Sequence, residues 1–216
     1  MKIIDKLIFW FRLKFFYFCI SNFNFFYKKK IKYNYDFEKL IKILNDKKIL
    51  LLGNAPINQN NINFDQFDII IRINILPKQT KVNSHSRTDI LMMLGSGGTH
   101  WVLEKNIIKI WLEYSNSSYT NYARGEIYHY PKNWEESLTK KLHAVPSAGV
   151  RCIDFLTKIL SNPKISIYGF TFSEDNWYDK LVGQVKSSIK HNYTEEKKYF
   201  YEIIKKNENI NIFFVK

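Results

Sequence analysis

The sequence has few of the residues that build cross-linked or metal-stabilised folds. Among its 216 residues are only two cysteines, Cys19 and Cys152, which lie in different segments. Two distant cysteines do not make a disulfide framework, and such scarcity is typical of a protein from a reducing compartment. Clusters of histidine, cysteine and carboxylate residues at metal-ligand spacing are also missing, so we expect no metal site.

Signatures of dinucleotide and nucleic-acid binding are missing as well. The chain has neither the full G-x-G-x-x-G fingerprint nor a P-loop. It has no sustained basic helix and no aromatic RNA-binding signature, so nucleic acid is not an expected partner. The formal net charge of +13, from 33 basic and 20 acidic residues, still favours an anionic partner such as a phosphorylated substrate or an acidic lipid surface.

Length and composition predict one folded domain with a short appendage. Hydrophobic residues make up 45% and charged residues 25% of the chain, which is typical of a globular protein. This length suits one domain with a full-sized core. We expect that domain to cover residues 35–216 and a separate segment to cover residues 1–34.

The segment 1–34 is apolar, aromatic and basic. Its residues 7–20 are mostly apolar or aromatic, but Arg12 and Lys14 interrupt them, and a lysine triplet follows at 28–30. A spanning helix needs about 20 mostly apolar residues, and two central cations are costly there. No small-residue cleavage site indicates a signal peptide. We expect the segment to lie in the membrane interface; packing onto the domain or into a dimer, or a true span, are the alternatives.

After the segment, short apolar runs alternate with helical patterns. Asp36 is a candidate N-cap for a helix that runs through Leu44. Strands are predicted at 48–52, 68–73, 89–94, 107–112, 127–130, 165–168 and 210–215, and further helices at 149–160 and 194–206. This alternation predicts an α/β fold, with a single Rossmann-like, mostly parallel sheet and helices on both faces.

The first predicted strand ends in the turn Gly53-Asn54-Ala55. Open α/β folds bind ligands at the carboxyl edge of the sheet, where this turn is expected. Glycine lets a ligand approach the backbone closely, and the Asn54 amide can both donate and accept hydrogen bonds. An ordinary strand-end turn is the alternative interpretation.

Arg72 and Asn74 share one face of the second predicted strand. A buried arginine needs an anionic or carbonyl partner, so Arg72 either supports a ligand site or forms a structural pair with Asp89. Asn74 lies near the strand end, where a ligand contact is expected.

Two helix starts carry further candidates. Ser147, Ala148 and Gly149 begin a helix whose free N–H groups and positive dipole end suit a carboxylate or phosphate, although Ser147 could simply cap that helix. His191 precedes the last helix, where the dipole disfavours the imidazolium cation. A neutral imidazole is what a general base needs. The alternative is an exposed histidine beside a capping Thr194.

The strand 165–168 ends at Gly169-Phe170, and the aromatic residues Trp177 and Tyr178 follow. A glycine turn and an aromatic loop at the carboxyl edge of a sheet could form one wall of a nucleotide pocket.

Together and in this order, these segments resemble the sialylmotifs of the animal-type sialyltransferases. In motif order the matching residues are Gly53-Asn54 with Arg72-x-Asn74, Ser147-Ala148-Gly149 with Gly169-Phe170, Asn176-Trp177-Tyr178, and His191-x4-Glu196. The similarity covers about residues 47–216. Bacterial sialyltransferases with a Gly-Asn-Gly-Pro-Ser turn look like more distant relatives.

The resemblance implies a variant glycosyltransferase-A fold and an inverting, metal-independent transfer from CMP-sialic acid without a cofactor. By position, it implies that Asn54 and Asn74 contact the cytidine nucleotide. It places Ser147 and Gly149 against the carboxylate and phosphate of the donor. His191 would take the proton of the acceptor hydroxyl.

The chain departs from the family at two points. Tyr178 stands where the family has a histidine that bonds the leaving phosphate, and its hydroxyl can still donate a hydrogen bond. The family's cysteine before Gly53 is absent. These departures favour a bacterial enzyme on the cytoplasmic face of the inner membrane. The expected acceptor is a glycan, and a glycolipid such as lipooligosaccharide fits the expected membrane contact of residues 1–34. A transferase for another CMP-activated acidic sugar and a non-catalytic membrane-binding module are the alternatives.

Overall fold

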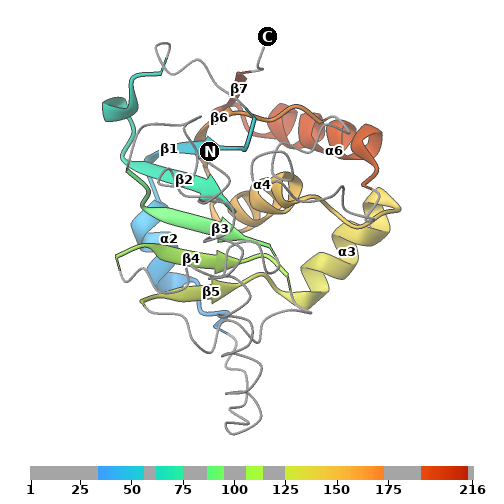
Figure 1. Cartoon of the computed structure of the whole chain (residues 1–216), viewed down its shortest axis with the longest axis horizontal. Helices are drawn as coiled ribbons and strands as arrows, with labels where there is room; N and C mark the ends of the chain where they lie inside the picture. The colour runs from blue at the N-terminus through green and yellow to red at the C-terminus, as the bar shows by residue number, and fades with distance from the viewer. Residues whose placement is uncertain are drawn as a thin grey trace, which may run out of the picture. The chain divides into compact units, whose positions relative to one another are not determined.

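The computed structural model describes most of the chain from residue 34 onward (Figure 1). The described residues are 34–55, 62–74, 87–94, 106–113, 125–172 and 191–213. All of them belong to one compact unit, Tyr33–Lys216. The predicted membrane-interface segment therefore lies, apart from Asn34, outside the described residues. Among the helices that are described, none has the length and apolarity to cross a membrane.

The described strands form a single parallel sheet. They are β1 (Lys48–Leu52), β2 (Ile69–Ile73), β3 (Ile90–Met93), β4 (Ile108–Trp111), β5 (Ile127–His129), β6 (Lys164–Tyr168) and β7 (Ile210–Phe213). Their order across the sheet is β5-β4-β3-β2-β1-β6-β7, and every neighbouring pair is parallel. The chain moves outward from β1 to β5 and then returns to the other side of β1. The topological switch point, where ligands bind in folds of this kind, therefore lies between β1 and β6.

Apolar side chains cover both faces of the sheet, as a parallel sheet requires. On one face, Ile49 and Leu51 of β1 belong to the main core together with α2 (Glu38–Leu44), α4 (Ala148–Ile159) and α6 (Tyr193–Lys206). On the other face, Leu50 and Leu52 pack with the 3-10 helix η2 (Phe64–Gln66). The predicted α/β fold, with one Rossmann-like parallel sheet, is confirmed.

The predicted helices at 149–160 and 194–206 match α4 and α6 to within one residue at each end. The helix α3 (Lys132–Leu142) was not predicted. It buries only Leu138 and Leu142, which pack with Val150 of α4, so its apolar stripe is narrow. Figure 1 shows α3, α4 and α6 grouped together.

Two predicted caps differ from the structure. The N-cap of α2 is Phe37, although the Asp36 carboxylate still accepts the Glu38 N–H at 3.2 Å. The N-cap of α6 is Asn192, whose side chain accepts the Glu195 N–H, so the interpretation of Thr194 as the cap is wrong.

Candidate functional site

The carboxyl ends of β1 and β6 meet with no side chain between them. The Gly53 N–H donates to the Tyr168 carbonyl (2.8 Å), and the Ala55 N–H donates to the Gly169 carbonyl (3.2 Å). A Cβ atom at Gly53 would overlap the Gly169 carbonyl. Gly169 has a φ of +75°, which side-chain-bearing residues rarely adopt. The contact therefore needs both glycines, and it holds the half-buried Asn54 at the switch point.

Phe170 connects this turn to the start of α4. A Cβ atom at Gly149 would lie 2.6 Å from the Phe170 ring, and one at Gly53 would lie 3.0 Å from it. The ring is buried and packs 5.7 Å, centroid to centroid, from Phe200 of α6. Phe170 is thus a core residue that brings three of the predicted site segments together.

The carboxylate of Glu196 is attached to Ser147. Its Oε1 accepts the Ser147 N–H at 2.6 Å and its Oε2 accepts the Ser147 hydroxyl at 2.7 Å, while the side chain is only 1% exposed. Ser147 is the N-cap of α4 by position, yet its side chain makes no capping bond. The interpretation of Ser147 as a plain cap is therefore wrong, because its hydroxyl joins α4 to α6 instead.

The first turn of α4 retains its backbone donors. The first N–H groups of a helix have no intrahelical acceptor. Within the described part of the chain, the N–H groups of Ala148 and Gly149 have no hydrogen-bond acceptor, and both residues are only half-buried. Together with the positive end of the helix dipole, such groups suit an anion.

His191 lies beside the same helix start. Its Nδ1 is 2.7 Å from the carbonyl oxygen of Val145. Because a carbonyl oxygen can only accept, Nδ1 carries a proton in this contact and Nε2 keeps its lone pair. The same Nδ1 lies 3.9 Å from Oε1 of Glu196, and the imidazole is 17% exposed. A fixed tautomer, a free ring nitrogen and a carboxylate behind the ring are the features of a general base.

Opposing effects set the protonation of Glu196. Burial raises the pKa of the Glu196 carboxyl, whereas the hydrogen bonds from Ser147 and the charges of His191 and Arg151 act to lower this pKa, with burial prevailing. A carboxylate whose negative charge is already costly would gain from a cation beside it. Protonation of His191 would supply that cation.

Arg151 supports the segment that carries Val145 and Ser147. Its Nε donates to the Pro146 carbonyl (3.1 Å), and its Nη1 donates to the Leu112 carbonyl (2.6 Å) and pairs with Glu135 (2.9 Å). The guanidinium is buried and therefore needs these partners. Arg151 was not predicted as a site residue, because an arginine at this position of a helix has no distinctive sequence pattern.

Asn74 lies at the carboxyl end of β2, as predicted, and it makes structural hydrogen bonds to the neighbouring strand β3. It adopts a left-handed φ of +59°, which asparagine tolerates better than most residues. Its N–H donates to the Met92 carbonyl (2.8 Å), and its side-chain oxygen accepts the Leu94 N–H (2.7 Å). The amide oxygen of Asn74 thus fixes the end of β3 against β2.

Arg72 does not pair with Asp89, so that alternative interpretation of Arg72 is wrong. The register places Arg72 beside Leu91, whereas Asp89 lies just before β3, where its N–H donates to the Ile70 carbonyl. Asp89 accepts the Ile70 N–H and pairs with Arg87 at 3.1 Å. Arg72 is buried and donates from Nε to the Thr88 hydroxyl (3.0 Å), and burial lowers its pKa to about 10. Asp89 therefore does not belong to the site.

A second buried polar cluster lies between α4 and its neighbours. Asp154, which is 1% exposed, accepts hydrogen bonds from the hydroxyls of Tyr130 and Tyr199 and pairs with Lys158 at 2.8 Å. Burial raises the pKa of both tyrosines. This cluster stabilises the packing of α4 against β5 and α6, and sequence patterns did not indicate it.

The predicted residues Trp177 and Tyr178 lie outside the described residues. The described residues contain no group of three or more histidine, cysteine or acidic side chains arranged to hold a metal ion. Neither models of known protein families nor curated proteins match the sequence.

Proposed function

We propose that the chain is an inverting, metal-independent sialyltransferase, with CMP-sialic acid as donor and a glycan hydroxyl, on a glycolipid such as lipooligosaccharide, as acceptor. One observation carries the proposal: His191, Glu196 and Ser147 form a continuous set of contacts at the start of α4. The sialyltransferase resemblance independently implies the base at His191 and a donor contact at Ser147. Membrane attachment through residues 1–34, at the cytoplasmic face, is part of the same proposal.

The contacts support a simple division of roles. Nε2 of His191 takes the proton from the acceptor hydroxyl as its oxygen bonds to the anomeric carbon of the donor. The bond from that carbon to the phosphate oxygen breaks, and its electron pair leaves with CMP. Glu196 stabilises the imidazolium that forms, because its carboxylate lies 3.9 Å from Nδ1. The N–H groups of Ala148 and Gly149 suit the charge that grows on the leaving phosphate.

Replacement of His191 tests the proposal. Because a general base contributes about 10²–10⁴-fold, we expect H191A to lose at least about a hundredfold in turnover while it keeps its affinity for CMP. His143→Asn is the matched control, since His143 is exposed and has a left-handed φ of +52° that asparagine tolerates. Transfer by H191A at near the wild-type rate would exclude His191 as the base.

Ligand stabilisation tests the donor class. CMP at 100 times its dissociation constant should add about 2.7 kcal/mol to the free energy of unfolding. A non-catalytic membrane-binding module would show no such stabilisation. Comparison of the hydrolysis of CMP-sialic acid with that of other CMP-sugars separates a sialyltransferase from a transferase for a different acidic sugar.

A further inference from the structure

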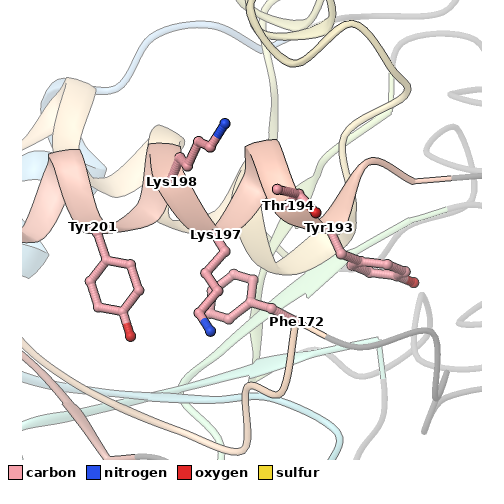
Figure 2. A pocket seen from close by; sticks show the side chains of 6 residues that line it. All are labelled: Phe172, Tyr193, Thr194, Lys197, Lys198 and Tyr201. Atoms are coloured by element: carbon pink, nitrogen blue, oxygen red, sulfur yellow. The ribbon is translucent and has the colours of Figure 1, made fainter.

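The outer face of α6 carries a groove that the mechanism above leaves unused. Figure 2 shows the side chains that line it, namely Phe172, Tyr193, Thr194, Lys197, Lys198 and Tyr201. Its volume is about 560 Å³, which falls in the range of small-molecule sites, about 300–1,000 Å³. The lining positions on the helix recur three and four residues apart, so they share one face. That face differs from the one that buries Phe200 and Ile203, and Phe172 at its edge packs 4.8 Å, centroid to centroid, from Phe200.

The groove adjoins the candidate base. The ring of Tyr193 lines the groove and also contacts the ring of His191, edge to face, with 5.7 Å between the centroids. Tyr193 therefore belongs both to the groove and to the surroundings of the imidazole, and a molecule in the groove would reach His191 past the Tyr193 ring.

The lining residues combine cationic and aromatic groups. Lys198 pairs with Glu195 at 2.6 Å, whereas Lys197 forms no ion pair with another described residue. None of the lining residues is acidic, so the positive charge of Lys197 is not compensated within the groove. Phe172, Tyr193 and Tyr201 offer aromatic surface, against which the apolar face of a sugar ring can pack.

We propose that this groove is the acceptor subsite and that the acceptor is an anionic saccharide, with its carboxylate or phosphate held by Lys197. The inference rests on the proposed transferase function and adds the chemical class of the acceptor. An acidic membrane surface is the competing partner. Membrane recognition uses clusters of four to eight basic residues, whereas only two lysines line this groove.

The test measures transfer by the full chain to lactose, to sialyllactose and to a lactose phosphate ester. We expect K197Q to raise KM for the two anionic acceptors about fivefold, the effect of a strong solvent-accessible ion pair, and to leave KM for lactose unchanged. K197R should restore the wild-type values. Lys164→Gln is the matched control, because Lys164 is exposed at the amino end of β6, at the opposite edge of the sheet.

Two further measurements distinguish a failure of the acceptor-subsite proposal from a failure of the proposed transferase function. CMP-sialic acid at 100 times its dissociation constant should stabilise the wild type by about 2.7 kcal/mol without any acceptor, and absence of this stabilisation would refute the transferase function itself. Direct titration of the lactose phosphate ester then tests the groove without turnover. Equal affinity in wild type and K197Q would overturn the inference. Weakened binding of K197Q to phosphatidylglycerol vesicles, with unchanged affinity for both anionic sugars, would overturn it in favour of a membrane contact.

Discussion

Replacement of Glu196 by glutamine should lower activity without lowering stability. Glutamine has nearly the same shape, its carbonyl can accept the Ser147 N–H, and its amide can donate to the Ser147 hydroxyl, so the joint between α4 and α6 survives. What the variant removes is the negative charge behind His191. Glu195→Gln is the matched control, since it removes a carboxylate from the same helix turn at an exposed ion pair with Lys198.

The distance between the Glu196 carboxylate and the His191 ring determines the expected loss of activity. Two unit charges about 4 Å apart interact by about 4 kcal/mol at an effective dielectric constant of about 20 and by about 1 kcal/mol in water. Oε1 of Glu196 is 3.9 Å from Nδ1 of His191, and the partly exposed imidazole places the pair between these limits. An intermediate value of about 2 kcal/mol corresponds to a fall in kcat of about thirtyfold.

Although E196Q should lower activity, it should keep or raise the stability of the folded protein. Burial raises the pKa of Glu196, so the folded protein binds the proton of this group more tightly than the unfolded chain. Wild-type stability therefore falls as the pH rises from the unfolded value of 4.5 through the folded pKa. E196Q does not undergo this loss. At pH 8 its free energy of unfolding should equal or exceed that of wild type, and the difference should vanish near pH 4.

Urea unfolding at pH 4 and pH 8, combined with turnover at saturating donor, checks both parts. A purely structural Glu196 would make E196Q unstable at both pH values and reduce activity only through unfolding. Equal turnover losses in E196Q and E195Q would refute the specific role of the charge behind His191.

Three further predictions concern other parts of the domain. Gly53→Ala places a methyl group on the Gly169 carbonyl and should cost about 2–4 kcal/mol of stability in a urea titration; a loss below about 0.5 kcal/mol would contradict the close backbone contact. Burial lowers the pKa of His129 to about 4, so wild type should lose about 1–2 kcal/mol between pH 6.5 and pH 5, where the unfolded chain protonates first. His129→Gln should remove this acid-dependent loss. If the free energy of unfolding of the variant fell equally between pH 6.5 and pH 5, His129 would not be the group responsible. Tyr130→Phe leaves Asp154 with one hydrogen-bond donor fewer and should lower the free energy of unfolding, measured by urea titration, by about 1–3 kcal/mol. An unchanged free energy of unfolding would show that this hydrogen bond contributes little.

The sequence predicted the fold well because the sheet is parallel and buried on both faces. Runs such as Ile69–Ile73 are apolar at nearly every position, which singles out strands even without alternation. The helix Lys132–Leu142 was not predicted because it buries only two side chains, so its sequence shows little helical periodicity of apolar residues. The 3-10 helix Phe64–Gln66 is too short to have a period.

The candidate site was predictable as segments but not as contacts. Strand ends and helix starts are local features, and they indicated Gly53, Ser147 and His191. Which side chains meet across 49 residues, as Ser147 and Glu196 do, depends on how α6 packs against α4. The same limit explains the error at Asp89, where charge alone suggested Arg72, whereas the register places Arg72 beside Leu91 and Asp89 pairs with the nearby Arg87.

The charge balance at the start of α4 connects the proposed base, His191, with the proposed phosphate contact at Ala148 and Gly149. Glu196 already places a carboxylate at the positive end of this helix, so a donor phosphate at Ala148 and Gly149 would bring a second anion to the same dipole. Two anions at one helix start repel unless a proton or a cation is added. Burial has raised the pKa of Glu196, and a nearby phosphate would raise it further. In the proposed mechanism, the proton that His191 would take from the acceptor supplies the missing positive charge as the phosphate charge grows, so the site would be better balanced during transfer than before it.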